Sequence, residues 1–194
     1  MLVTLPVFLI EEGFSQVLLD LALPKIWFSI LSIFIGVALV EEVFKYLVVK
    51  EKVLSDPEFD EPVDVMLYMI ISALGFAALE NILIFFSEVF EKNYETFLLS
   101  VIRFLSATFL HALCSGLVGY YLARSFFEIQ KRFKLIATGL TVSIILHGLY
   151  NFSIMKVEGD LRFLVPIIIL VSLAIFVSLG FKRLKKLKSV CKIQ

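Results

Sequence analysis

Long apolar runs separated by short polar segments are the dominant pattern of this sequence. Five runs are long enough to cross roughly 30 Å of hydrocarbon at a helical rise of about 1.5 Å per residue. They lie at about 26–49, 64–87, 97–123, 134–154 and 162–181. Pro24 precedes the first run, and Trp27 suits its interfacial end. The pattern predicts an all-α fold, a polytopic membrane helical bundle with about five transmembrane helices in one domain over 1–194.

The first 24 residues are less regular. The apolar run 1–10 is short and stops at Glu11 and Glu12. Beyond it, four apolar residues share one helix face at i, i+3, i+4 and i+7: Phe14, Val17, Leu18 and Leu21. Two interpretations stay open. Either 1–24 is a helix that lies in the membrane interface, or 1–10 is the end of a span that starts before this chain.

The distribution of basic residues predicts how the chain is oriented. The formal net charge is zero, but thirteen of the 18 Lys and Arg residues flank alternate ends of the spans. They place the loops 50–63 and 124–133 and the tail 182–194 in the cytoplasm of a multi-pass cell-membrane protein. The basic tail is expected to attract anionic lipid. No basic patch suggests nucleic acid, and Cys114 and Cys191 suggest no disulfide framework.

Ionisable and amide side chains interrupt four consecutive spans. A charged residue at the centre of a membrane helix costs roughly 2.5–3.5 kcal/mol on insertion scales, so such residues form a functional-site hypothesis by default. The set comprises Glu41, Glu42 and Lys45, then Glu80 and Asn81, then His111, and finally His147 and Asn151. The two histidines are the only ones in the chain.

Helical spacing indicates how these groups can pair. Glu42 and Lys45 are i, i+3 neighbours, so an ion pair would lower the cost of burying both. Glu41 points about 100° away from Glu42 and is expected to face a cavity. His147 and Asn151 are i, i+4 and share a face. Small residues near Glu80 and His111 would let the helices approach closely: Gly75, Ala77, Ala78, Ser115, Gly116 and Gly119.

Each residue also has a purely structural interpretation. Glu42 and Lys45 can be an ion pair without a catalytic role. Asn81 can hydrogen-bond a neighbouring helix, and a single membrane histidine such as His111 is often an interhelical donor. The functional interpretation depends on the whole set, since carboxylates and imidazoles recur near mid-depth on neighbouring spans.

The chemistry available to this set is water activation. The sequence holds no G-x-S-x-G and no H-E-x-x-H motif. A carboxylate in a low-dielectric site becomes a competent general base near neutral pH. His147 and Asn151 could donate hydrogen bonds to the oxyanion of a tetrahedral intermediate. No cofactor is required, but the same Glu and His side chains could instead hold a divalent metal such as zinc.

Four sequence runs resemble one known family, the PrsW proteases. They are V-E-E-V-F-K (40–45), G-F-A-A-L-E-N (75–81), F-L-H-A (109–112) and L-H-G-L-Y-N (146–151). That family is related to the type II CAAX prenyl endopeptidases and the bacteriocin-processing enzymes. The last motif ends in Asn151 where many PrsW relatives carry Asp, and relatives often have further spans at the N-terminus.

The resemblance implies a glutamic-type intramembrane endopeptidase. Glu41 would be the general base, with Glu42 tied to Lys45 and Glu80 near the water. His147 and Asn151 would match the oxyanion pair, and His111 the family's intervening histidine.

The expected substrate is a single-span membrane protein such as an anti-sigma factor. Alternatives are a CAAX-like or bacteriocin-leader protease, a metal-dependent variant, a proton-coupled transporter, or a scaffold without activity. The sequence makes no prediction of oligomeric state.

Overall fold

A computed structural model describes residues 4–52, 54, 61–88 and 94–187, and every regular element in these ranges is a helix. The order is α1 (Thr4–Asp20), α2 (Lys25–Leu31), η1 (Ser32–Leu39), α3 (Val40–Lys52), α4 (Pro62–Glu88), α5 (Tyr94–Phe127), η2 (Ile129–Lys131), α6 (Arg132–Lys156) and α7 (Leu161–Leu184). The all-α prediction is confirmed.

Among the residues that the structure describes, five helices are long and apolar enough to cross a membrane. They cover Lys25–Lys52, Pro62–Phe85, Val101–Phe127, Ile129–Lys156 and Leu161–Leu184. The first of them joins α2, η1 and α3 into one continuous helix. Each overlaps one apolar run of the sequence, so the five predicted spans are confirmed and the chain is a multi-pass membrane protein.

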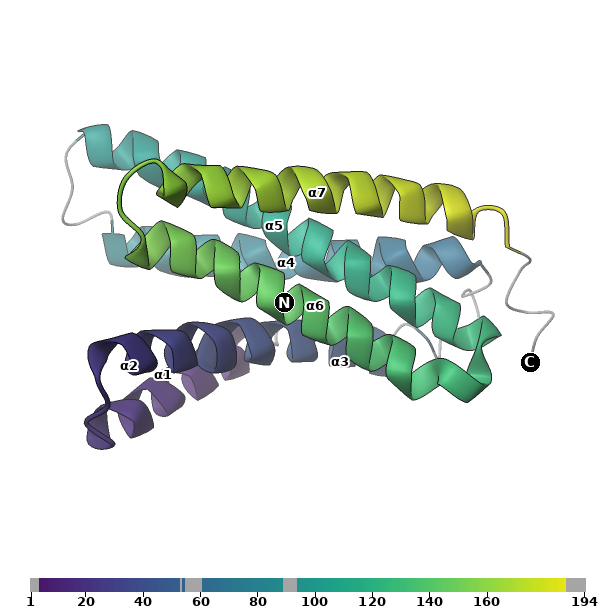
Figure 1. Ribbon diagram of the computed structural model, residues 1–194, viewed down its shortest axis with the longest axis horizontal. Coiled ribbons are helices and arrows are strands. Elements are labelled where there is room, and N and C mark those ends of the chain that lie inside the picture. Colours follow the sequence, from purple (N-terminus) through teal and green to yellow (C-terminus); the bar gives the residue numbers. More distant parts are fainter. Residues whose placement is uncertain (1–3, 53, 55–60, 89–93, 188–194) are drawn as a thin grey trace.

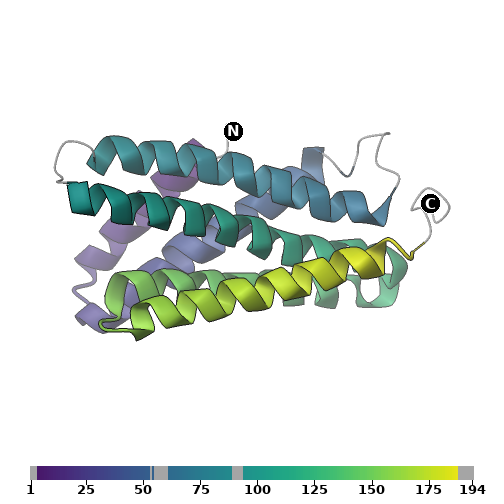
Figure 2. The same cartoon turned by 90° about the horizontal axis from the view of Figure 1, so that it is seen from above.

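The spans lie side by side along the long axis of the molecule (Figures 1 and 2). The buried core lies mainly among α4, α5 and α7, where Met66, Leu117 and Val177 are almost fully enclosed. The end of α3, the α5–α6 turn and the end of α7 share one end of the bundle (Figure 1). These are the basic segments that the sequence assigns to the cytoplasm. Of that prediction, Lys188 and Lys192, together with Cys191, lie outside the described residues.

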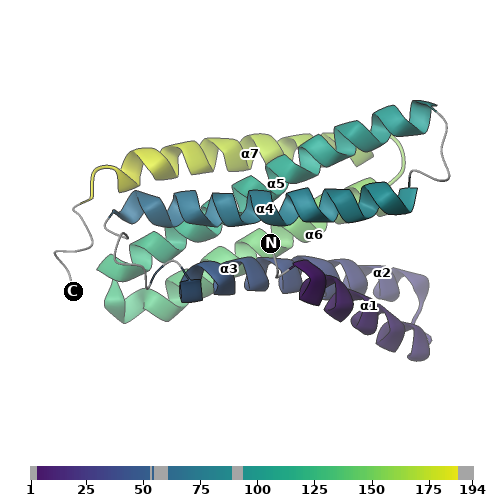
Figure 3. The same ribbon diagram turned by 180° about the vertical axis from the view of Figure 1, so that it is seen from behind.

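The first helix packs along the first span and is not separate from the bundle (Figure 3). The Phe14 ring covers Gly36, where an added Cβ would lie 2.9 Å from the ring. The apolar face that the sequence predicts for this segment lies partly inward and partly outward. Leu18 is buried, but Val17 and Leu21 are 56% and 60% exposed. The inward stripe instead consists of Thr4, Val7, Glu11, Phe14 and Leu18.

A π-helical segment, η1, immediately precedes Glu41. Its wider turns change the register of the residues that follow, and such segments are frequent at functional sites. Gly148 of α6 lies against this segment. An added Cβ there would lie 2.4 Å from Cδ1 of Phe34, so only glycine allows this approach. The contact brings α6, with His147, onto the helix that carries Glu41.

Close helix approach through small residues is found after His111, as expected. A Cβ on Gly119 would lie 2.8 Å from the Met66 backbone, and one on Gly116 would lie 3.1 Å from Val177. Gly75 does not fit the prediction, since a Cβ there would meet nothing within 4 Å. The glycine that lets α4 and α5 approach closely is therefore Gly119 of α5, and Gly75 of α4 makes no such contact.

Candidate active site

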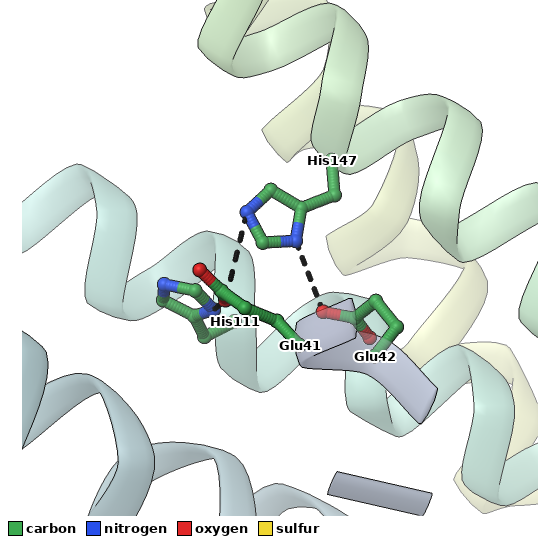
Figure 4. Close-up of side chains that lie close together, drawn as sticks. All are labelled: Glu41, Glu42, His111 and His147. Atoms are coloured by element: carbon green, nitrogen blue, oxygen red, sulfur yellow. Dashed lines mark hydrogen bonds and ion pairs between the residues drawn. The ribbon is translucent and has the colours of Figure 1, made fainter. Parts of the chain in front are cut away.

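Four buried side chains from three spans meet at the centre of the bundle. Glu41 and Glu42 come from α3, His111 from α5 and His147 from α6 (Figure 4). One ligand-type atom from each lies within 4.8 Å of the others. The two imidazole rings meet edge to face, with their centroids 4.9 Å apart. These four residues are called the Glu/His cluster below, and they confirm that the sequence-predicted groups converge.

Lys45 lies inside this cluster. Its Nζ is 3.1 Å from Glu41 Oε2, 2.8 Å from Glu42 Oε1 and 2.7 Å from His111 Nδ1. The sequence predicts the pair with Glu42, and the structure adds Glu41 and His111 as partners. Lys45 is 1% exposed and surrounded by protein.

The second nitrogen of His111 is held by Glu80. His111 Nε2 lies 2.9 Å from Glu80 Oε2, and a carboxylate only accepts hydrogen bonds, so Nε2 carries the proton. Nδ1 then accepts a hydrogen bond from Lys45. Asn81, next to Glu80, donates to Thr108 Oγ1 at 2.9 Å, which matches its structural interpretation.

Glu42 contacts α6 through both of its carboxylate oxygens. Ser143 Oγ donates to Glu42 Oε2 at 2.8 Å, and His147 Nδ1 lies 3.0 Å from Glu42 Oε1. With the Lys45 contact, both oxygens of the buried Glu42 have partners. Ser143 is a residue that sequence analysis missed. The available signal was its position one helical turn before His147, on the same face.

The orientation of His147 leaves its other nitrogen facing Glu41. With Nδ1 donating to Glu42, the neutral form of the His147 ring has its lone pair on Nε2, which lies 4.0 Å from Glu41 Oε2. Polar atoms separated by more than about 3.5 Å are often bridged by a water. The gap has the size for one water bound to both atoms.

A cavity of about 190 Å³ adjoins this gap. Its polar lining includes Glu41, Glu80, His111 and Asn151. It continues past Ile84, Phe104 and Met155, toward the end of the bundle opposite to the basic segments. Asn151, one turn beyond His147, lines this cavity and is not part of the cluster itself.

A second cavity, of about 230 Å³, lies between α1 and α4. It shares Glu11, Glu41, Glu80 and Ile84 with the first cavity. Most of its other lining residues are apolar: Val7, Phe8, Phe76 and Leu83. The two cavities thus meet at the carboxylates, one with a more polar lining and the other with a more apolar lining.

Glu11 is the main site residue that sequence analysis missed. Its Oε1 is shielded from solvent and has no hydrogen-bond partner within the described part of the chain. Burial, with the nearby carboxylates Glu41 and Glu80, raises the pKa of Glu11 from 4.5 to about 9. The sequence signal was present, since Glu11 shares the stripe of Val7, Phe14 and Leu18 at i−4, i+3 and i+7.

The Glu/His cluster suits a divalent metal by residue type, because imidazole and carboxylate are zinc ligands. The arrangement does not suit one while Lys45 is in place. The ammonium already contacts three of the four ligand groups at 2.7 to 3.1 Å. The residues as arranged therefore do not fit a resident metal.

Fold and site together define a multi-pass membrane protein with a buried glutamate–histidine centre. Residues 1–179 match the family model described as PrsW family intramembrane metalloprotease. The chain therefore belongs to the PrsW family, as the sequence motifs predicted.

Individual relatives agree with this assignment. The chain is 34% identical over 125 residues to Protease PrsW of Geobacillus kaustophilus, a match covering 64% of this chain and 52% of the relative. It is 28% identical over 162 residues to Protease PrsW of Bacillus subtilis, covering 83% of this chain and 69% of the relative. A third relative, Protease PrsW of Oceanobacillus iheyensis, is 30% identical over 137 residues, 71% of this chain and 60% of the relative.

The chain spans between about half and two thirds of the length of these curated relatives. No solved structure gives a significant match.

Proposed function

We propose that this chain is an intramembrane endopeptidase in which Glu41 activates a water molecule. The observation that carries the proposal is the 4.0 Å gap between Glu41 Oε2 and His147 Nε2, together with the cavity that Glu41 lines. Two acceptors at this separation can hold both hydrogens of one water and turn its lone pair toward a substrate carbonyl. Membership in the PrsW family supports this reaction class.

The proposed reaction needs only groups that the chain supplies. The water oxygen attacks the carbonyl carbon of the peptide bond while Glu41 takes a proton from the water. Asn151, on the cavity wall, is the nearby amide donor for the carbonyl oxygen as negative charge develops there. The C–N bond then breaks, and Glu41 returns the proton to the leaving amine nitrogen. Glu42 keeps His147 oriented through the 3.0 Å contact with Nδ1.

The shape of the site favours a membrane-anchored substrate. The apolar cavity between α1 and α4 suits a lipid-embedded segment, and the polar cavity suits the chain that follows it outside the bilayer. We therefore propose a single-span membrane protein, such as an anti-sigma factor, as the substrate. With the C-terminus in the cytoplasm, the polar cavity would open to the outer side, and the basic tail would contact anionic lipid.

The direct test compares new protein termini in membranes of cells producing the wild-type chain or Glu41→Gln. The wild type should generate cleavage products from single-span proteins. The variant should reduce their rate of formation by about 10²–10⁴-fold, the usual contribution of a general base. Glu12→Gln is the matched control, because Glu12 is exposed on α1 and, in the described structure, accepts a side-chain hydrogen bond from Gln16.

Two results would contradict the proposal. Identical protein termini in wild-type and empty-vector membranes would contradict the proposed peptidase activity. Products that persist at the wild-type rate in Glu41→Gln membranes would remove Glu41 from the base role and leave the activity standing.

A further inference from the structure

The Lys45 ammonium lies at the centre of the Glu/His cluster, where a metal ion would also bind. The cluster has two carboxylates and two imidazoles, which is a ligand set that zinc accepts. The family description also names a metalloprotease. The structure places a lysine ammonium where the ligand atoms converge, so the two possible cations compete for the same groups.

The Lys45 ammonium has all of its hydrogen-bonding capacity satisfied. It has three N–H donors, and three acceptors surround it: Glu41 Oε2, Glu42 Oε1 and His111 Nδ1. The Phe76 ring lies 4.7 Å from Nζ, at cation–π distance. A buried charge is tolerated when it is paired and fully hydrogen-bonded. Lys45 meets both conditions.

The ligand atoms that a metal needs are already committed. His111 uses Nε2 toward Glu80 and Nδ1 toward Lys45. His147 uses Nδ1 toward Glu42, which leaves only its Nε2 lone pair. A metal on His111 Nδ1 would have to break the 2.7 Å contact with Lys45.

Electrostatic repulsion adds to this competition. Zinc lies about 2.0–2.1 Å from a histidine nitrogen. A zinc ion bound to His111 Nδ1 would therefore be no more than about 5 Å from Lys45 Nζ, with little water to screen the two positive charges. Lys45 also cannot withdraw easily, since it is on the same helix face as Glu41 and Glu42 and is enclosed by protein.

We propose that Lys45 is the resident cation of this site and excludes a divalent metal from it. In this arrangement Lys45 is a positioning residue. It fixes both carboxylates of α3, and by occupying Nδ1 of His111 it fixes the ring toward Glu80. The inference deepens the proposed function of the same site, but its test measures metal content and requires no cleavage.

The test measures bound metal in the purified full chain in detergent micelles. Wild type, Lys45→Met and the control Lys50→Met are each titrated with Co²⁺ and with Zn²⁺ and then washed. Bound metal is counted by mass spectrometry, and Co²⁺ coordination is followed by its visible absorption. Lys50 is exposed near the end of the same helix, so its removal changes the same charge away from the cluster.

Wild type and Lys50→Met should hold no stoichiometric metal. Lys45→Met should bind close to one ion per chain, because Glu41, Glu42 and His111 lose their contacts with the ammonium. The melting temperature of this variant should rise when the ion is added, since binding to the folded state stabilises it.

A second variant covers the case in which Lys45→Met does not fold. Combining Lys45→Met with Glu42→Gln removes one positive and one negative charge, and it keeps Glu41, His111 and His147 as three metal ligands. This double variant should also gain metal.

One equivalent of tightly bound metal in the wild type would overturn the inference. So would the absence of any metal gain in a folded Lys45 variant. If the wild-type chain cleaves no single-span protein, and neither of these two metal results is found, the proposed function fails and the role of Lys45 stands.

Discussion

Two groups of charged residues in this molecule share the same sequence spacing but not the same environment. In the Glu/His cluster, Lys45 pairs with Glu41 at i, i+4 and with Glu42 at i, i+3. At the end of α5, Glu128 pairs with Arg124 at i, i+4 and with Lys131 at i, i+3. The Lys45, Glu41 and Glu42 side chains are 1%, 3% and 0% exposed, whereas those of Arg124, Glu128 and Lys131 are 39%, 30% and 69% exposed.

The difference shows that spacing alone does not set the value of an ion pair. Water screens the outer group, and its side chains can exchange their partner for solvent. In the inner group no water replaces a lost partner, so each charge depends on the others. The same i, i+3 and i, i+4 pattern thus marks an exposed helix end in one place and a candidate active site in the other.

The largest effect on stability is expected from Lys45→Met, measured with a chelator present. Removing the ammonium leaves Glu41 and Glu42 buried without their cation, and breaking a buried pair in this way costs on the order of 3 kcal/mol or more. The free energy of unfolding of Lys45→Met in mixed micelles should therefore be much lower than that of the wild type, while Lys50→Met should unfold like the wild type. Equal stability of the two variants would mean that the buried carboxylates do not need Lys45.

A smaller effect is expected from Glu11→Gln, and it depends on pH. Glu11 is less deeply buried than Glu42, and burial and the nearby Glu41 and Glu80 raise its pKa from 4.5 to about 9 on folding. The folded chain then keeps a proton that the unfolded chain releases, so stability falls as pH rises from about 4.5 to about 9.

Glutamine carries no titrating proton, so Glu11→Gln should remove this contribution. The melting temperature of the wild type should fall more steeply across that pH window than that of Glu11→Gln, with Glu12→Gln behaving like the wild type. Parallel curves for all three chains would show that Glu11 titrates normally.

The smallest effect is expected from Glu128→Ala. The hydrogen bond from Arg124 lowers the pKa of Glu128, but both partners are accessible to solvent. The melting temperature should stay within the error of measurement, and added salt should not change that result. A loss of stability approaching that of Lys45→Met would contradict the distinction between the two groups of charges.

Most of the fold could be predicted from the sequence. Five runs of apolar residues are a strong signal, because each run must by itself satisfy its backbone hydrogen bonds within the bilayer. The helix α1 was harder to assign. Its apolar run is short, and an apolar face does not by itself distinguish contact with lipid, which leaves Val17 and Leu21 exposed in the protein, from contact with the first span. The stripe that packs inward contains Glu11, and a search for apolar residues at helical spacing passes over a glutamate.

The residue types of the candidate site could also be predicted, since the membrane makes each buried carboxylate and imidazole conspicuous. Their pairing could be predicted only within one helix. Glu42 with Lys45 follows from i, i+3 spacing, but Ser143 with Glu42 joins residues 101 positions apart. Spacing within a helix contains no information about which face of a second helix will meet it.

The amino-acid sequence by itself determined the five apolar runs that the described structure folds into helices long enough to cross a membrane, and the costly polar groups in four of them, because hydropathy and charge are local properties. Only the tertiary structure decided that Lys45 occupies the centre of the site, that Glu11 of α1 reaches its cavities, and that His147 faces Glu41 across a 4.0 Å gap. Those relations depend on helix rotation and on close contacts such as Gly148 with Phe34, and packing between distant segments sets both.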